Sequence, residues 1–307
     1  SFPGGCELGP RPIDLHIDAL KRLGVDIKEE HGMFKCEVKE LCGTCINLSF
    51  PSVGATENIM LAGSVSKGIT VIHNAAKEPE IEDLQTFLNK MGARIKGAGG
   101  STIEIEGVGR LHGTQHRIMP DRIAAATYLT ASAITGGDVK LHQANSEHLI
   151  PILHVFEETG CKVLVRGNDI RLTRLGGIKP AKIIQTMPHP GFPTDAQAII
   201  MAYLTLAQGT SVFVETIFES RYKHVGELCR MGADIRVVGR MAVVYGVPAL
   251  MGAKVECGDL RGGAALAIAA LAAEGKSEVS HLHHIDRGYE KFEQNLYALG
   301  ADIKRIE

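Results

Sequence analysis

Met231-Gly232-Ala233-Asp234-Ile235 decides the fold, because its pattern of glycine, small residue, any residue and isoleucine or valine occurs five times in the chain. A helical pattern precedes each copy and a strand pattern follows it. Each glycine therefore stands where a helix ends, at a position that favours a left-handed backbone. The glycines of the five copies lie 68 to 72 residues apart, at Gly24, Gly92, Gly160, Gly232 and Gly300.

Two types of helix alternate along the chain. The helix before each repeated glycine is amphipathic, and Ile81, Leu84, Leu88 and Met91 form its apolar face in the second copy. The other type is small and apolar on every side, which predicts that it is buried. This second type occupies residues 124–134, 196–207 and 264–273.

Strand patterns, such as residues 137–141, separate the two types of helix. One repeat therefore reads as a βαβαββ unit of an α/β fold. A period of about 70 residues is too long for a solenoid, so we expect the units to cluster around shared buried helices, with sheets outside. We expect a domain boundary near Met119-Pro120, which gives domains 1–119 and 120–307. The opening residues are typical of the back part of a unit, so we expect an N-terminal portion of the first domain to be missing.

The composition excludes several classes of partner. The chain has 307 residues, 45% of them hydrophobic, and 33 basic residues balance 35 acidic ones. Nucleic acid and anionic membrane surfaces are therefore not expected as partners. The richest apolar run, residues 264–273, is too short to span a bilayer. Seven scattered cysteines indicate reduced thiols and a cytoplasmic setting.

The loop Pro3-Gly4-Gly5-Cys6 is a candidate reactive site. A glycine pair lets the backbone bend tightly, and both Arg11 and a following helix N-terminus favour the thiolate of Cys6. The alternative is a buried cysteine that acts as a small hydrophobe. Local chemistry leaves both interpretations open.

Arginines recur at equivalent positions of the repeat. The position thirteen residues before each repeated glycine, where the amphipathic helix should begin, holds Arg11 in the first copy and Arg287 in the last. Arg221 and Arg261 lie at predicted turn-to-helix junctions. Because the helix dipole disfavours a cation at the N-terminus, this recurrence indicates an anion site. The alternative for each is an exposed surface arginine.

Ordered motifs spread over the whole chain carry a family resemblance. They are Pro3-Gly4-Gly5-Cys6 and residues 9–16, 51–60, 74–81, 192–195, 218–221 and 284–290. Together they make the chain similar to the UDP-N-acetylglucosamine 1-carboxyvinyltransferase family. The resemblance implies two inside-out α/β barrel domains of βαβαββ units, the first of them incomplete here.

The resemblance also implies an activity, namely transfer of the enolpyruvyl group of phosphoenolpyruvate to the 3'-hydroxyl of UDP-N-acetylglucosamine in peptidoglycan synthesis. It implies no cofactor and no metal. By resemblance, Cys6 is the proton donor, Asp195 is the base at the sugar hydroxyl, and Arg287 is a third catalytic residue. Arg11, Arg221 and Arg261 match cationic positions around phosphoenolpyruvate. Contacts to substrate are further implied for Pro12, Ile13, Asp14, Leu15, Ser52, Val53, Gly54, Glu78, Ile217 and Asp259.

The chain departs from the family pattern at two places, and two alternative functions stay open. The family usually has a basic or polar residue near Phe50-Pro51 and Ala-Ser at Gly262-Gly263. One alternative function is a non-catalytic fragment or paralogue that binds the nucleotide sugar. The other is the related 3-phosphoshikimate 1-carboxyvinyltransferase, against which the cysteine loop argues. Cys42-Gly43-Thr44-Cys45 and the histidines at residues 281–284 are interpreted as structural.

Overall fold

The repeated glycines end helices, as the sequence predicts. The computed structural model describes residues 13–306, and in it all five glycines have φ between 92° and 101°. An L side chain is strained in that region, whereas glycine lets the chain turn out of the helix without cost. The glycine repeat is therefore confirmed as a repeat of helix ends.

We predict that Gly232→Ala destabilises the protein by about 1–2 kcal/mol, because a left-handed L residue costs that much. The space where the new Cβ would stand is open, so the loss comes from backbone strain and not from a clash. The matched control is Gly226→Ala, inside helix α7 (Val225–Arg230) and also in open space. It should stabilise the protein by about 0.5–1 kcal/mol. Denaturant unfolding measures both, and equal effects would contradict the prediction.

The described residues divide into two compact units. The first comprises residues 13–119 together with Pro188–Pro190, and the second comprises residues 120–187 and 191–306. Each unit contains one full βαβαββ repeat. In the first these elements are β3 (Cys45–Asn47), α2 (Val53–Gly63), β4 (Ile69–His73), α3 (Pro79–Lys90), β5 (Arg94–Lys96) and β6 (Thr102–Glu106). In the second they are β10 (Ile183–Gln185), α6 (Thr194–Leu204), β11 (Thr210–Val214), α7, β12 (Asp234–Val238) and β13 (Met241–Tyr245).

The two full repeats have the same topology. The strand orders are β3-β4-β6-β5 and β10-β11-β13-β12. In both sheets the first two strands pair in parallel, as expected for a helical crossover, and the other pairs are antiparallel. One topology used twice confirms the βαβαββ interpretation of the sequence.

Partial repeats complete the two units. The first unit adds α1 (Asp14–Arg22) and a hairpin of β1 (Asp26–Glu30) and β2 (Met33–Glu37). The second adds α4 (Arg122–Thr135), β7 (Asp138–Leu141), a 3-10 turn (Ser146–Leu149), α5 (Ile150–Glu158), β8 (Cys161–Arg166) and β9 (Asp169–Arg174). It also adds β14 (Lys254–Glu256), α8 (Leu260–Ala272), β15 (Glu278–Ser280), α9 (His283–Asp286) and α10 (Phe292–Ala298).

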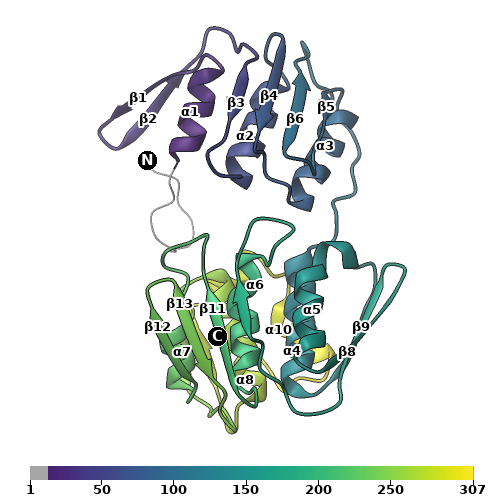
Figure 1. The fold of residues 1–307 in the computed structure, drawn as a ribbon, viewed down its shortest axis with the longest axis vertical. Helices are drawn as coiled ribbons and strands as arrows, with labels where there is room; N and C mark the ends of the chain where they lie inside the picture. The colour runs from purple at the N-terminus through teal and green to yellow at the C-terminus, as the bar shows by residue number, and fades with distance from the viewer. Residues whose placement is uncertain (1–12, 307) are drawn as a thin grey trace. The chain divides into compact units, whose positions relative to one another are not determined.

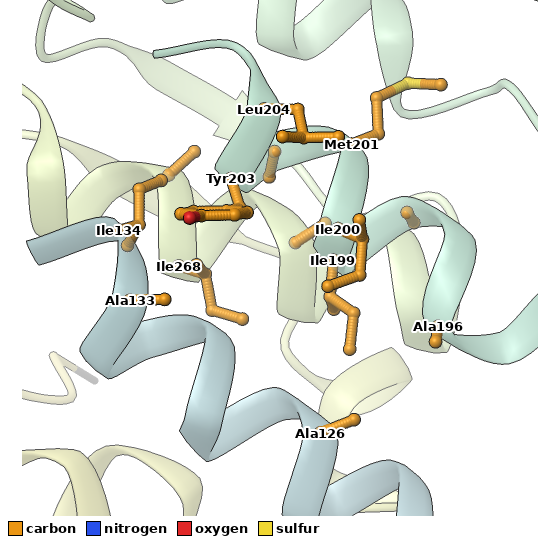
Figure 2. Close-up of a cluster of buried hydrophobic side chains, with 14 of the residues drawn as sticks. Ala126, Ala133, Ile134, Ala196, Ile199, Ile200, Met201, Tyr203, Leu204 and Ile268 are labelled. Atoms are coloured by element: carbon orange, nitrogen blue, oxygen red, sulfur yellow. The ribbon is translucent and has the colours of Figure 1, made fainter. Parts of the chain in front are cut away.

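The helices that are apolar on every side form the core of the second unit. Helices α4, α6 and α8 pack against one another, with sheets on the outer sides (Figure 1). Figure 2 shows side chains of the three helices gathered in one cluster, among them Ile134 of α4, Ile199 and Tyr203 of α6, and Ile268 of α8. Alanines such as Ala126 let the backbones come close. The predicted burial of these helices is confirmed.

The strands of the described residues belong to several small sheets. The strands of residues 13–306 form five separate sheets of two to four strands, and none of them closes into a barrel. The last copy of the repeat differs from the others, because residues 301–306 form no strand. In the other four copies, the strand after the repeated glycine pairs with the next strand along the chain. The described residues contain no such next strand after Gly300.

Candidate active site

Three of the predicted site residues meet in the second unit. Asp195 lies in the first turn of α6, Arg261 lies in the first turn of α8, and Arg221 lies in the turn before α7. Arg221 Nη2 donates to Asp195 Oδ1 at 2.8 Å, and Arg261 Nη2 lies 3.7 Å from Asp195 Oδ2. The fold thus brings two guanidinium groups to one carboxylate, from three separate elements.

Arg221 is fixed from several sides. Its side chain is only 3% exposed. Its Nε and Nη2 also donate to the backbone oxygen of Thr194, at 3.3 Å and 3.0 Å, and the guanidinium lies 5.7 Å from the centre of the Phe218 ring. Such a fork of bonds holds an arginine in one orientation. Arg221 is therefore preorganised in the absence of any ligand.

The carboxylate of Asp195 is charged at neutral pH. Burial raises the pKa of Asp195, but the guanidinium groups of Arg261 and Arg221 outweigh that effect and hold the pKa below its ordinary value. About 44% of the side chain remains exposed, so the carboxylate can still be reached. Asp195 is an accessible anion between two largely buried cations.

Arg261 is held by an aromatic residue that the sequence analysis did not single out for the site. Its Nη1 donates to the hydroxyl of Tyr289 at 3.1 Å, and the guanidinium lies 5.5 Å from the centre of the Tyr289 ring. The same hydroxyl lies 2.8 Å from Thr127 Oγ1 on α4. Tyr289 therefore fixes Arg261 both by a hydrogen bond and by a cation–π contact.

Asp259 acts on this cluster through the backbone. It is buried, and its Oδ1 caps α8 by accepting from the backbone N–H groups of Arg261 and Gly262, both at 3.0 Å. A Cβ at Gly262 would lie 2.7 Å from Asp259 Oδ2, and one at Gly263 would lie 2.8 Å from Cys257 Sγ. The departure from the usual Ala-Ser is thus matched by close packing around the cap.

Glu215 is a buried residue that the sequence analysis missed. Its Oε1 accepts from Thr186 Oγ1 and from the backbone N–H groups of Ile217 and Phe218, at 2.8–3.1 Å. Its Oε2 accepts from Thr194 Oγ1 at 3.0 Å. One carboxylate thus ties the start of α6 to the segment that carries Ile217, for which a substrate contact is implied. No motif marks such a residue, because its side-chain partners, Thr186 and Thr194, are distant in sequence.

We predict that Glu215→Ala destabilises the protein by about 3 kcal/mol or more, because it leaves several buried donors without an acceptor. The control is Glu219→Ala in the same segment. Glu219 is exposed and paired with Arg240, so its loss should change the stability by no more than about 0.5 kcal/mol. Denaturant unfolding compares the two variants. A small effect of Glu215→Ala would show that the segment is held by other contacts.

Of the other predicted catalytic residues, Arg287 makes no bond to this cluster and Cys6 lies outside the described residues. Arg287 is exposed at the end of α9, and its guanidinium makes no hydrogen bond or ion pair with the described residues. The sequence analysis expects a helix to begin thirteen residues before each repeated glycine, which is Arg287 in the last copy and Glu219 in the fourth. That expectation is wrong for both copies, because α10 and α7 begin a few residues after these positions. Cys6, Arg11 and Pro12 lie outside the described residues.

The first unit brings its predicted residues to two neighbouring helix starts. Ile13 precedes α1, whose first residues are Asp14 and Leu15. Ser52 caps α2 by accepting from the backbone N–H of Ala55 at 3.3 Å, and Val53 and Gly54 follow it. Helix N-termini of this kind attract phosphate groups.

His16 joins these two helix starts and is a residue that the sequence analysis did not select. Its ring lies against Gly54, where a Cβ would stand 3.1 Å from His16 Cε1, and its Nδ1 lies 2.7 Å from Asn58 Nδ2. Burial lowers the pKa of His16, and the nearby Asp14 only partly offsets this. Gly54 is therefore needed for the close approach of α1 and α2.

Glu78 precedes α3 in the first unit. Its Oε1 accepts from the backbone N–H of His189 at 3.2 Å, and its buried Oε2 has no hydrogen-bond partner. Neighbouring carboxylates act on Glu57 of α2, whose pKa is raised by burial and by Glu80 and Glu78. The structure thus places Glu78 near other acidic groups, and no ion pair joins it to a cation within residues 13–306.

Residues 13–306 offer neither a metal site nor a membrane-spanning helix. They contain no group of three or more side chains placed to hold a metal ion. None of their helices is long and apolar enough to cross a bilayer. Their six cysteines are all free thiols, and burial raises the pKa of Cys257 to about 12, with a further contribution from Asp259.

Comparison with known proteins gives close relatives over the whole chain. A family model described as EPSP synthase (3-phosphoshikimate 1-carboxyvinyltransferase) matches residues 1–296. UDP-N-acetylglucosamine 1-carboxyvinyltransferase 2 of Caldanaerobacter subterraneus subsp. tengcongensis is 56% identical over 307 residues, covering 100% of this chain and 73% of that protein. The corresponding protein of Finegoldia magna is 50% identical, with the same coverage of both chains.

Solved structures agree with the fold. The crystal structure of the enolpyruvyl transferase NikO from Streptomyces tendae has a TM-score of 0.87 at 26% identity, covering 96% of this chain and 72% of that one. EPSP synthase from Acinetobacter baumannii has a TM-score of 0.74 at 20% identity, covering 99% and 74%, and shows the fold alone. The predicted fold type is confirmed.

Proposed function

Because the chain belongs to the UDP-N-acetylglucosamine 1-carboxyvinyltransferase family, we propose that it transfers the enolpyruvyl group of phosphoenolpyruvate to the 3'-hydroxyl of UDP-N-acetylglucosamine. The observation that carries this proposal is the accessible Asp195 carboxylate between the guanidinium groups of Arg221 and Arg261. A carboxylate can accept a hydroxyl proton, while adjacent cations hold an anionic partner. We place the reaction in peptidoglycan synthesis and in the cytoplasm, as the resemblance implies.

The reaction needs an acid and a base. In the addition, the sugar oxygen bonds to C2 of phosphoenolpyruvate while C3 gains a proton, which forms a tetrahedral ketal. In the elimination, the bond from C2 to the phosphate oxygen breaks and C3 loses a proton, which restores the methylene group. We assign the proton transfer at C3 to Cys6 and the removal of the hydroxyl proton to Asp195. No metal and no cofactor enters this scheme.

The arginine side chains of the candidate site have two roles in this proposal. Arg11, Arg221, Arg261 and Arg287 provide positive charge for the phosphate and carboxylate of phosphoenolpyruvate. In the absence of substrate, Arg261 and Arg221 also hold the pKa of Asp195 low, which makes it a weak base. An anion bound to these guanidinium groups offsets their field and raises the basicity of Asp195. Binding of phosphoenolpyruvate therefore activates the base that the next step requires.

The nucleotide side of the reaction falls to the first unit. We assign contacts to UDP-N-acetylglucosamine to residues 12–15 at the start of α1 and to Ser52, Val53 and Gly54 at the start of α2. Free backbone N–H groups at these helix starts suit a diphosphate. Ile217, Glu78 and Asp259 complete the proposed substrate contacts, with Asp259 acting through the cap of α8.

Phosphate release tests the proposed function. The assay uses the 307-residue chain and a version extended to the full length of its relatives, with each substrate alone and with both. The proposal expects phosphate only when both substrates are present. Nucleotide-sugar binding without phosphate release by either protein would instead support the non-catalytic alternative. Phosphate release that requires 3-phosphoshikimate as acceptor would support the other alternative, which the 50–56% identical relatives do not favour.

We predict that Cys6 is alkylated by the epoxide antibiotic that targets this family, and faster when UDP-N-acetylglucosamine is present. The physical reason is that a nearby cation and a helix N-terminus favour the thiolate. Peptide mass spectrometry locates the adduct. Cys229, an exposed free thiol, serves as the internal control. Equal labelling of Cys6 and Cys229 would contradict a specially reactive Cys6.

A further inference from the structure

His224 is a buried polar residue that the proposed reaction leaves without a role. It lies in the turn before α7, three residues after Arg221, and is only 4% exposed. Neither of its ring nitrogens has a hydrogen-bond partner among the described residues. An unpaired buried polar group lowers the free energy of unfolding by about 1–3 kcal/mol, so stability alone does not account for a histidine at this position.

His224 packs against the helix that carries Arg261. A Cβ on Gly262 would lie 3.0 Å from His224 Cβ, so the residue packs directly against the first turn of α8. That turn carries Arg261 and is capped by Asp259. The histidine therefore fills the space between the turn that carries Arg221 and the helix end that carries Arg261.

The ring also lies in a charged environment. Burial and the Arg221 guanidinium lower the pKa of His224, and together they outweigh Asp259 and the backbone of Arg221, which favour the charged ring. The imidazole is thus neutral at neutral pH. Because the ring is neutral, it does not repel the Arg221 guanidinium, and that guanidinium keeps its ion pair with Asp195.

We propose that His224 is a positioning residue, which wedges the Arg221 turn against α8 and so holds the Arg221 guanidinium on Thr194 and Asp195. For the proposed function, on which this inference rests, the consequence is that His224 sets the affinity for phosphoenolpyruvate through Arg221. The proposal attributes this role to the volume of the side chain, since neither ring nitrogen meets a hydrogen-bond partner at bonding geometry within residues 13–306. Nothing in the sequence marks this residue, because the contact with Gly262 appears only in three dimensions.

Three variants separate volume from polarity. His224→Ala removes the ring, whereas His224→Gln and His224→Leu keep a neutral side chain of similar size, with and without polar atoms. Substitutions that preserve the volume should preserve the position of Arg221, and His224→Ala should not.

The first readout needs no substrate. The Nε–H of Arg221 donates to the backbone of Thr194, so its exchange with solvent, followed by NMR, reports the position of the guanidinium. We expect exchange at least about tenfold faster in His224→Ala, and near-normal exchange in the Gln and Leu variants. Unchanged exchange in His224→Ala, or fast exchange in both volume-preserving variants, would overturn the proposal.

The second readout links the position to the reaction. His224→Ala should raise KM for phosphoenolpyruvate about tenfold, with KM for UDP-N-acetylglucosamine within about twofold. In an Arg221→Lys background the same change should have little further effect, because both act through one group. Full additivity of the two substitutions would overturn the proposal. If Arg221 exchange responds as expected but no variant, nor the unaltered chain, turns over substrate, positioning is supported and the proposed function fails.

Discussion

Asp195→Asn is expected to lower kcat for phosphate release by about 10²–10⁴-fold, the usual contribution of a general base. The amide keeps the shape of the side chain and can still accept from Arg221, but it cannot take the proton of the sugar hydroxyl. Binding of UDP-N-acetylglucosamine should change much less, because the hydroxyl can still form a hydrogen bond. Steady-state kinetics with both substrates, together with calorimetry for the nucleotide sugar, measure the two effects.

The matched control for this variant is Asp138→Asn. Asp138 is also paired with an arginine, Arg171, but both side chains are largely exposed and lie on β7 and β9. Its substitution should leave kcat within about twofold, since exposed ion pairs contribute little. A kcat for Asp195→Asn within a few-fold of the unaltered protein would remove Asp195 from the role of base.

The same residue gives a pH dependence with a defined sign. Its folded pKa lies below the ordinary value of 3.8, so the charged carboxylate stabilises the folded state above that value. The stabilisation is lost as the pH falls through the lowered folded pKa. The difference in unfolding free energy between the unaltered protein and Asp195→Asn should therefore shrink in acid and stay constant from about pH 5 to neutrality.

Local chain chemistry explains how much of the fold could be predicted. A glycine that ends a helix needs a left-handed backbone, so Gly24 to Gly300 could be recognised from the sequence alone. Helices that are apolar on all sides, such as α6, have no alternative to burial. The order in which strands pair depends on contacts across many residues, so the division into five separate sheets could not be predicted from local patterns.

Some residues of the candidate site could likewise be predicted from the sequence, and others could not. Asp195, Arg221 and Arg261 were selected from motifs and helix starts, and the structure brings them together. Glu215 and His224 were missed, because their importance comes from burial and from partners on other elements. Residues that touch a substrate leave a local pattern in the sequence, whereas residues that hold them in place leave none.

Arg261→Gln is expected to raise KM for phosphoenolpyruvate by about 10–100-fold, because one charge-assisted contact to an anion is worth about 1.5–3 kcal/mol. The glutamine keeps a polar side chain in the first turn of α8 but removes the charge and the contact with Tyr289. Arg261→Lys should fall between, since it keeps the charge and loses the planar fork. KM for UDP-N-acetylglucosamine should remain nearly constant, which steady-state kinetics can verify.

Tyr289→Phe distinguishes a direct role of Arg261 from a merely structural one. It removes the hydroxyl that accepts from Arg261 but keeps the ring for the cation–π contact, so the guanidinium loses one anchor and keeps its charge. We therefore expect a rise in KM for phosphoenolpyruvate of about 3–10-fold, smaller than for Arg261→Gln, from the loss of one hydrogen bond. Arg171→Gln, at an exposed arginine, is the control and should have no effect. If Tyr289→Phe and Arg261→Gln instead raise KM for UDP-N-acetylglucosamine, Arg261 serves the nucleotide sugar and the assignment of the anion must change.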